Sequence, residues 1–155
     1  MRVLILGFLC LCTQLSAQLL VKIDNASPVT IDAPALAQFP RHIATLDDHG
    51  KPIRFEGVLL GDILAKNGVD LSKPLRGPKL STYLAAIGND GYEAVYALAE
   101  LDPTIVDAQL LVADHRDGAP LKAEEGPLRL IAPHDKRAAR SVKMLREIDV
   151  VQLRR

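Results

Sequence analysis

The pattern of apolar and polar positions along this chain predicts many short strands and few helices. Runs of strand length, rich in Val, Ile, Leu and Tyr, alternate with segments that contain Gly, Asp, Asn and Pro. We expect strands, in chain order, at residues 19–24, 29–32, 42–58 as a hairpin, 80–87, 108–121 as a second hairpin, 127–133 and 147–153. A further apolar segment lies within residues 91–101.

Two turn sequences and one helical pattern give these segments their boundaries. Residues 48–51 (DHGK) predict the turn of the first hairpin, and residues 116–118 (RDG) predict the turn of the second. Residues 33–40 (APALAQFP) are typical of a turn or a single helical turn that Pro40 ends. In residues 57–68, Leu59, Leu60, Ile63 and Leu64 have helical spacing, and an Asn-Gly pair predicts the end of a short amphipathic helix.

The connections between the expected strands are too short for repeated strand-helix-strand crossovers. Strands also outnumber helices in the expected order of elements. The sequence therefore predicts an α+β domain with mixed or antiparallel sheets and a few short helices.

The amino-terminal residues differ from the rest of the chain. Met1-Arg2 precedes an apolar run at residues 3–12, and TQLSAQ then places a small residue, Ala17, where signal peptidase cuts. We expect residues 1–17 to be a signal peptide and residues 18–155 to be a single exported, periplasmic domain. No later apolar run approaches the roughly 20 residues that a membrane helix needs, so direct membrane insertion is not expected after cleavage.

Composition narrows the possible chemistry. Cys10 and Cys12, the two cysteines, fall in the expected signal peptide, so the mature domain is expected to lack disulfides, thiolate metal ligands and a cysteine nucleophile. The 19 basic residues equal the 19 acidic residues, which argues against a nucleic-acid partner. The four histidines show no metal-ligand spacing, and no nucleophile, base and orienting group form a recognisable set.

One segment concentrates positive charge. Residues 133–143 (PHDKRAARSVK) place Arg137, Arg140 and Lys143 close together after an apolar run. An arginine fork, a lysine point charge and backbone amides together suit a phosphate or carboxylate. The alternative is a solvated surface stretch, neutralised by Asp135 and by acidic residues further along.

The order of several motifs resembles a known family. These are FEGVLLGDILAKNGV, NDGYEAVYALAELD, LLVADHRDGAPLKAEEGPLRLIAP and RSVKML. Across residues 42–151, they are similar to the molybdopterin-binding domain of the sulfite-oxidase-like oxidoreductases. The resemblance implies that fold, and it implies a pterin or molybdopterin-like ligand.

The resemblance to the family, together with position in the sequence, indicates which residues line the ligand site. It implies that Arg140, Ser141 and Lys143 help hold the pterin and its phosphate, and that Tyr92 lies near the pocket. Arg129 also matches, with a structural role equally open. We add to this set four basic residues of the same segment and of the stretch before the first hairpin: Arg137, His134, His42 and Arg41.

The sequence departs from the family at the metal. In the family a cysteine upstream of the G-V-x-L helix supplies a thiolate to molybdenum, whereas residues 42–58 contain no cysteine. We therefore expect a non-catalytic binding protein without a metal site. It would capture a pterin or related heterocycle and report occupancy to a membrane signalling partner, such as a cyclic-di-GMP cyclase or phosphodiesterase.

Two other hypotheses stay open. One is a molybdopterin-dependent oxidoreductase, or a subunit of one, whose metal lacks a protein thiolate. The other is an adaptor protein whose pocket is vestigial.

Overall fold

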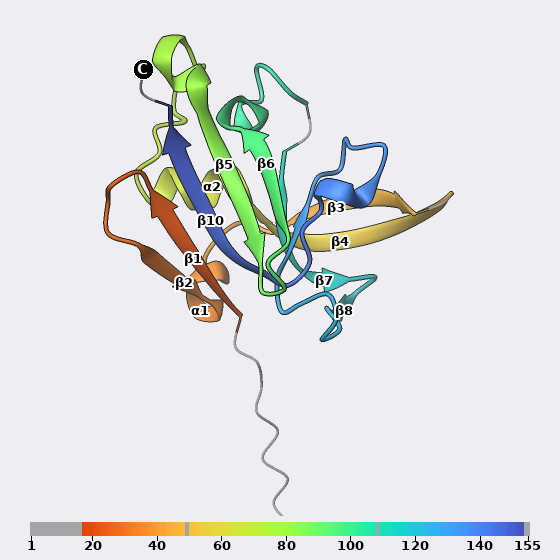
Figure 1. The fold of residues 1–155 in the computed structure, drawn as a ribbon. Coiled ribbons are helices and arrows are strands. Elements are labelled where there is room, and N and C mark those ends of the chain that lie inside the picture. Colours follow the sequence, from red (N-terminus) through yellow and green to blue (C-terminus); the bar gives the residue numbers. More distant parts are fainter. Residues whose placement is uncertain (1–16, 49, 108, 154–155) are drawn as a thin grey trace, which may run out of the picture.

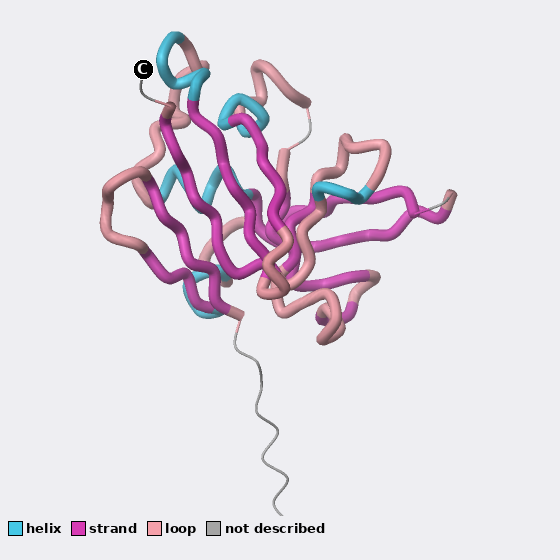
Figure 2. The backbone as a smooth tube through the Cα atoms, in the orientation of Figure 1, coloured by secondary structure: helices cyan, strands magenta, loops and turns pink. Residues whose placement is uncertain are grey.

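The backbone of this protein consists mainly of strands and loops, with few and short helices (Figures 1 and 2). The structure is a computed structural model that describes residues 17–48, 50–107 and 109–153. The expected α+β class with mixed sheets is confirmed. All of the expected signal peptide except Ala17 lies outside the described residues.

Most elements lie where the hydrophobic pattern predicts them. In chain order they are β1 (Gln18–Ile23), β2 (Val29–Asp32), α1 (Ala33–Leu36), β3 (His42–Asp48), β4 (Lys51–Leu59), α2 (Leu60–Lys66), the 3₁₀ turn η1 (Gly77–Ser81), β5 (Thr82–Gly88), β6 (Glu93–Ala97), η2 (Leu98–Leu101), β7 (Leu111–Arg116), β8 (Ala119–Pro120), β9 (Arg129–Ile131), η3 (Ala138–Arg140) and β10 (Leu145–Gln152).

The first sheet joins the two ends of the described chain. Its strand order is β2-β1-β10-β5-β6, and β1 runs parallel to β10, with Leu20 opposite Glu147 and Ile23 opposite Val150. The other pairs in this sheet are antiparallel. A parallel pair between the first and last strands makes the sheet mixed and ties residues far apart in the sequence.

The second sheet contains both hairpins. Its order is β3-β4-β7-β8, and β9 pairs with β7. The turn between β7 and β8 has positive φ at Asp117 (50°) and Gly118 (84°), as a two-residue hairpin turn with the right twist requires. In Figure 1, the β3–β4 hairpin extends away from the first sheet, and the loop that carries η3 lies beside it.

Helix α2 fills the core behind the first sheet (Figure 1). Leu60, Ile63 and Leu64 are fully buried there, in one cluster with residues of β1, β5 and β10. The predicted helical stripe is correct except at Leu59, which ends β4. The strand expected to begin at residue 80 begins at Thr82, because Gly77–Ser81 form a 3₁₀ turn with Gly77 at φ 58°.

Candidate functional site

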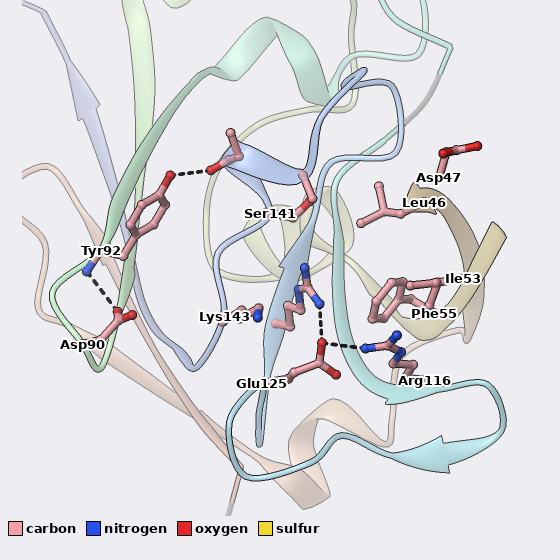
Figure 3. Close-up of a pocket in the computed structure, with 13 residues that line it drawn as sticks. Leu46, Asp47, Ile53, Phe55, Asp90, Tyr92, Arg116, Glu125, Ser141 and Lys143 are labelled. Atoms are coloured by element: carbon pink, nitrogen blue, oxygen red, sulfur yellow. Dashed lines mark hydrogen bonds and ion pairs between the residues drawn. The ribbon is translucent and has the colours of Figure 1, made fainter. Parts of the chain in front are cut away.

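A cavity of about 420 Å³ opens between the β3–β4 hairpin, the ends of β7 and β9, and the loop that precedes β10 (Figure 3). It has both charged and apolar walls. The residues that line it are Leu46, Asp47, Ile53, Phe55, Asp90, Tyr92, Arg116, Glu125, Arg129, Ala138, Ala139, Ser141 and Lys143.

The segment before β10 brings Ser141 and Lys143 to this cavity. Val142 between them is fully buried and belongs to the main hydrophobic core, whereas Ser141 and Lys143 line the cavity. Ser141 is also buried, and its Oγ accepts a hydrogen bond of 3.1 Å from the amide of Ala132, which leaves the hydroxyl proton available to donate. Lys143 is exposed and forms no ion pair with any residue of the described chain. The two side chains supply hydrogen-bond donors for an anionic or acceptor-rich ligand.

Two arginines and one glutamate form the charged floor of the cavity. Oε1 of Glu125 accepts hydrogen bonds from Nη1 of Arg116 at 2.8 Å and from Nη1 of Arg129 at 2.7 Å (Figure 3). The guanidinium carbon of Arg129 lies 5.1 Å from the centre of the Phe55 ring. One carboxylate oxygen thus bridges two guanidinium groups that come from different strands of the second sheet.

The wall across the cavity from Ser141 and Lys143 is apolar. Leu46 from β3 and Ile53 and Phe55 from β4 line it, and Figure 3 shows them across the cavity from Ser141 and Lys143. An apolar wall opposite hydrogen-bond donors suits a planar ring with an anionic or carbonyl substituent.

Tyr92 stands at the turn before β6, where it lines the cavity and contacts the basic segment. Its hydroxyl donates a hydrogen bond of 2.6 Å to the carbonyl of Ala139, and its amide donates one of 3.0 Å to Oδ1 of Asp90. The predicted proximity of Tyr92, Ser141 and Lys143 is therefore present in the fold. Their contact with a ligand stays a prediction.

Arg140 does not line this cavity with them. Its guanidinium binds Asp135 at 2.9 and 2.7 Å and Glu100 at 3.2 Å through two nitrogens, and its central carbon lies 4.6 Å from the centre of the Tyr96 ring. The hydrogen bonds to Asp135 raise the pKa of Arg140 above its ordinary value, so the charge is permanent. This placement differs from the ligand contact that the sequence predicts, because two acidic side chains enclose the guanidinium.

The other four predicted residues lie elsewhere. His134 and Arg137 are exposed and are absent from the residues lining the cavity. His42 lines a different cavity of about 360 Å³, and Arg41 lines a third of about 300 Å³. A bidentate pair with Asp114, at 2.9 and 2.5 Å, holds Arg41 there and raises its pKa. None of these four therefore lines the cavity that Lys143 lines.

Sequence reasoning did not single out Arg116, Glu125, Phe55 or Leu46. A weak signal was present, because a glutamate four residues before Arg129 and an arginine at a hairpin turn are charges next to apolar strands. Pairing of β7 with β9 brings these strands together, with Val112 opposite Leu130.

Clusters of metal-binding side chains and long apolar helices are both absent from the part of the chain that the structure describes. Within residues 17–153, apart from positions 49 and 108, no group of three or more His, Cys, Asp or Glu side chains has the arrangement of a metal site. In the same residues no helix has the length and apolar character to cross a membrane. One of the four histidines, His49, lies outside the described residues.

The sequence matches one known protein family over nearly the whole described chain. A sequence model described as "Oxidoreductase molybdopterin binding domain" matches residues 18–155. The chain belongs to this family. The match includes β1 and β2, which lie before the residues where the motifs resemble the family.

Solved structures show the same fold. Twenty-eight chains match, among them the crystal structure of the sulfane dehydrogenase SoxCD from Paracoccus pantotrophus, with a TM-score of 0.65 and 19% identity. The alignment covers 86% of this chain and 38% of that chain, so this domain spans less than two fifths of its solved relative. No curated protein matches the sequence.

Proposed function

We propose that this molybdopterin-binding-family domain binds a pterin or related heterocycle that carries an anionic group, and does not itself catalyse a reaction. The observation that carries the proposal is the cavity in which Lys143 and Ser141 face the apolar wall of Phe55 (Figure 3). A ring would pack on the wall while a phosphate or carbonyl accepts hydrogen bonds from the donors.

The side chains that line the cavity suit the organic part of the molybdopterin cofactor better than they suit its molybdenum ion. Lys143 and Ser141 provide donors for a phosphate and for ring carbonyls, and Tyr92 provides an aromatic edge. When bound, the molybdenum of this cofactor supplies redox and oxygen-transfer chemistry. None of the described residues lining the cavity carries sulfur, and the two cysteines of the chain, Cys10 and Cys12, precede the described residues. We therefore derive no chemical step through the metal.

The cellular role is part of the same proposal. The amino-terminal pattern supports export to the periplasm, and a binding domain without its own reaction needs a partner that responds to occupancy. A membrane signalling protein with a periplasmic domain, such as a cyclic-di-GMP cyclase or phosphodiesterase, is the partner we propose. An adjacent gene of that class would support this role.

A second candidate is a molybdopterin-dependent oxidoreductase, or a subunit of one. The family match over residues 18–155 favours it, as does the shared fold with a sulfane dehydrogenase. Metal analysis of protein purified from its own host distinguishes the two, since stoichiometric molybdenum supports the oxidoreductase and its absence supports the binding protein.

Fluorescence titration with a reduced pterin tests the binding proposal. The chain has no tryptophan, so the ligand's emission is easily separated from that of the protein. We expect saturation at tens of micromolar, and about tenfold weaker binding for Lys143→Ala because it loses one charge-assisted hydrogen bond. Lys136→Ala is the matched control, since Lys136 is exposed in the same segment but does not line the cavity.

The contrary outcomes are equally specific. No binding by the native protein at tens of micromolar, or equal affinity in the native protein and Lys143→Ala, would count against the proposal. The second result would favour an adaptor with a vestigial pocket.

A further inference from the structure

The loop that carries Ser141 and Lys143 is fastened to strand β6 by two tyrosines. Tyr92, just before β6, donates its hydroxyl to the carbonyl of Ala139 at 2.6 Å. Tyr96, within β6, donates its hydroxyl to the next carbonyl, that of Arg140. Two successive carbonyls of η3 are thus bound by β6 and by the residue just before it, immediately before Ser141 and Lys143.

The Arg140 side chain completes this attachment. It lies over the Tyr96 ring and reaches both Asp135, at the start of the loop, and Glu100, in η2. Burial raises the pKa of the Tyr96 hydroxyl, which keeps it protonated and able to donate. One guanidinium group therefore joins both ends of the loop to η2, which directly follows β6.

All five N–H groups of the Arg140 guanidinium have an acceptor in this arrangement. Nε donates to Asp135, and Nη2 donates to Asp135 and to Glu100. Nη1 donates to Glu100 at 3.2 Å and to the carbonyl of Val95 at 3.5 Å. An arginine has no further donor to offer a ligand once these five are used.

We infer that Arg140 is a positioning residue, which fixes the loop so that Ser141 and Lys143 face the cavity and which does not itself touch the ligand. This inference rests on the proposed function, because its main measurement is ligand affinity. A loop held in place in the free protein has less freedom to lose when the ligand binds.

Whether Glu100→Gln weakens or strengthens ligand binding distinguishes a positioning role of Arg140 from direct contact between Arg140 and the ligand. If Arg140 contacted an anionic ligand, Glu100→Gln would remove a competing carboxylate and strengthen binding. If Arg140 positions the loop, Glu100→Gln loosens the same attachment and weakens binding. Glutamine can still accept the 3.0 Å hydrogen bond that Oε1 of Glu100 receives from the amide of Ala97, so the substitution is mild.

The experiment is a double-mutant cycle with a reduced pterin as the probe. We expect Arg140→Ala and Glu100→Gln each to weaken binding by about three- to tenfold, the equivalent of ordering one more side chain on binding. The double variant should bind about as weakly as the weaker single variant, because both changes break one attachment. Stronger binding by Glu100→Gln, or fully additive effects, would overturn the inference.

A matched control and a measurement without ligand complete the test. Lys79→Ala removes the exposed 2.8 Å pair with Asp70, away from the cavity, and should leave affinity unchanged. Hydrogen exchange at the amides of Ser141 and Lys143 should be faster in Arg140→Ala and unchanged in Lys79→Ala. Unchanged exchange in Arg140→Ala contradicts the positioning role, whereas failure of the native protein to bind pterin contradicts only the proposed function.

Discussion

Replacing Glu125 by glutamine isolates the charge on the cavity floor. The substitution keeps the shape of the side chain and removes the negative charge between Arg116 and Arg129. The exposed fraction is 6% for the Glu125 side chain and 8% for that of Arg129. Water therefore reaches the Arg129 guanidinium poorly and cannot compensate for the lost negative charge. We expect a large loss of stability from a single exchange of oxygen for nitrogen.

The size of the loss follows from the burial of each partner. Removing the charge of one member of a buried ion pair costs about 3–5 kcal/mol. Arg116 is 36% exposed, so solvent screens its share and most of the loss comes from Arg129. The amide oxygen of glutamine still accepts a hydrogen bond, which places the expected loss near the lower limit, at about 3 kcal/mol. With a urea dependence of about 2 kcal/mol per molar, the unfolding midpoint should fall by about 1.5 M.

The test compares the urea unfolding midpoints of three proteins: the native protein, Glu125→Gln and Glu124→Gln. Glu124 is the adjacent residue and is exposed, so its substitution removes the same charge without a buried partner and should leave the midpoint almost unchanged. The urea dependence should be equal in all three proteins, which shows that they expose the same surface on unfolding. A midpoint for Glu125→Gln within about 0.3 M of the native value would refute the assignment of a desolvated ion pair.

Three further substitutions test other parts of the structure. Gly57→Ala should lower stability by at least about 2 kcal/mol in urea unfolding, because the new Cβ would lie 2.0 Å from the carbonyl oxygen of Val112, a backbone atom that cannot turn aside; a native midpoint would contradict this packing. Gly88→Ala would place its Cβ 2.7 Å from the carbonyl oxygen of Lys143, so the backbone at Lys143 would have to move. We expect several-fold weaker pterin binding in a fluorescence titration. Native affinity in this variant would show that the position of Lys143 does not matter for binding. The carboxylate of Asp102 accepts a hydrogen bond from the backbone amide of Leu75, which lowers the pKa of Asp102 from its ordinary value of 3.8. The ionised carboxylate therefore stabilises the fold above pH 3.8, and this stabilisation is lost as the pH falls through the lowered pKa. The difference in urea midpoint between native protein and Asp102→Asn should therefore be widest near neutral pH and narrow in acid, and a difference independent of pH would contradict this.

The elements were predictable because their signals are local. The β7–β8 turn follows from an Asp-Gly pair whose residues accept positive φ, and the buried face of α2 follows from apolar residues at helical spacing. The errors occur where neighbours outweigh the local pattern, as at Leu59, which has helical spacing but pairs with Leu111 as the end of β4.

The candidate site was predictable only in part. Sequence motifs indicated Tyr92, Ser141 and Lys143, and these three line the cavity. The charged floor was not indicated, because the role of Glu125 depends on Arg116 lying beside Arg129 across two paired strands.

Arg140 and Lys143 show the same division most clearly. Both are cations of one short segment, and local sequence alone assigns both to the same ligand. Glu100, which lies 40 residues before Arg140 in the chain, pairs with one of them and leaves the other facing the cavity. Backbone periodicity and turn geometry act over a few residues, so the chain's own pattern specifies its strands, turns and helix. Long-range charge pairing and strand order arise only when distant segments pack, and they determine which cation is available to a ligand.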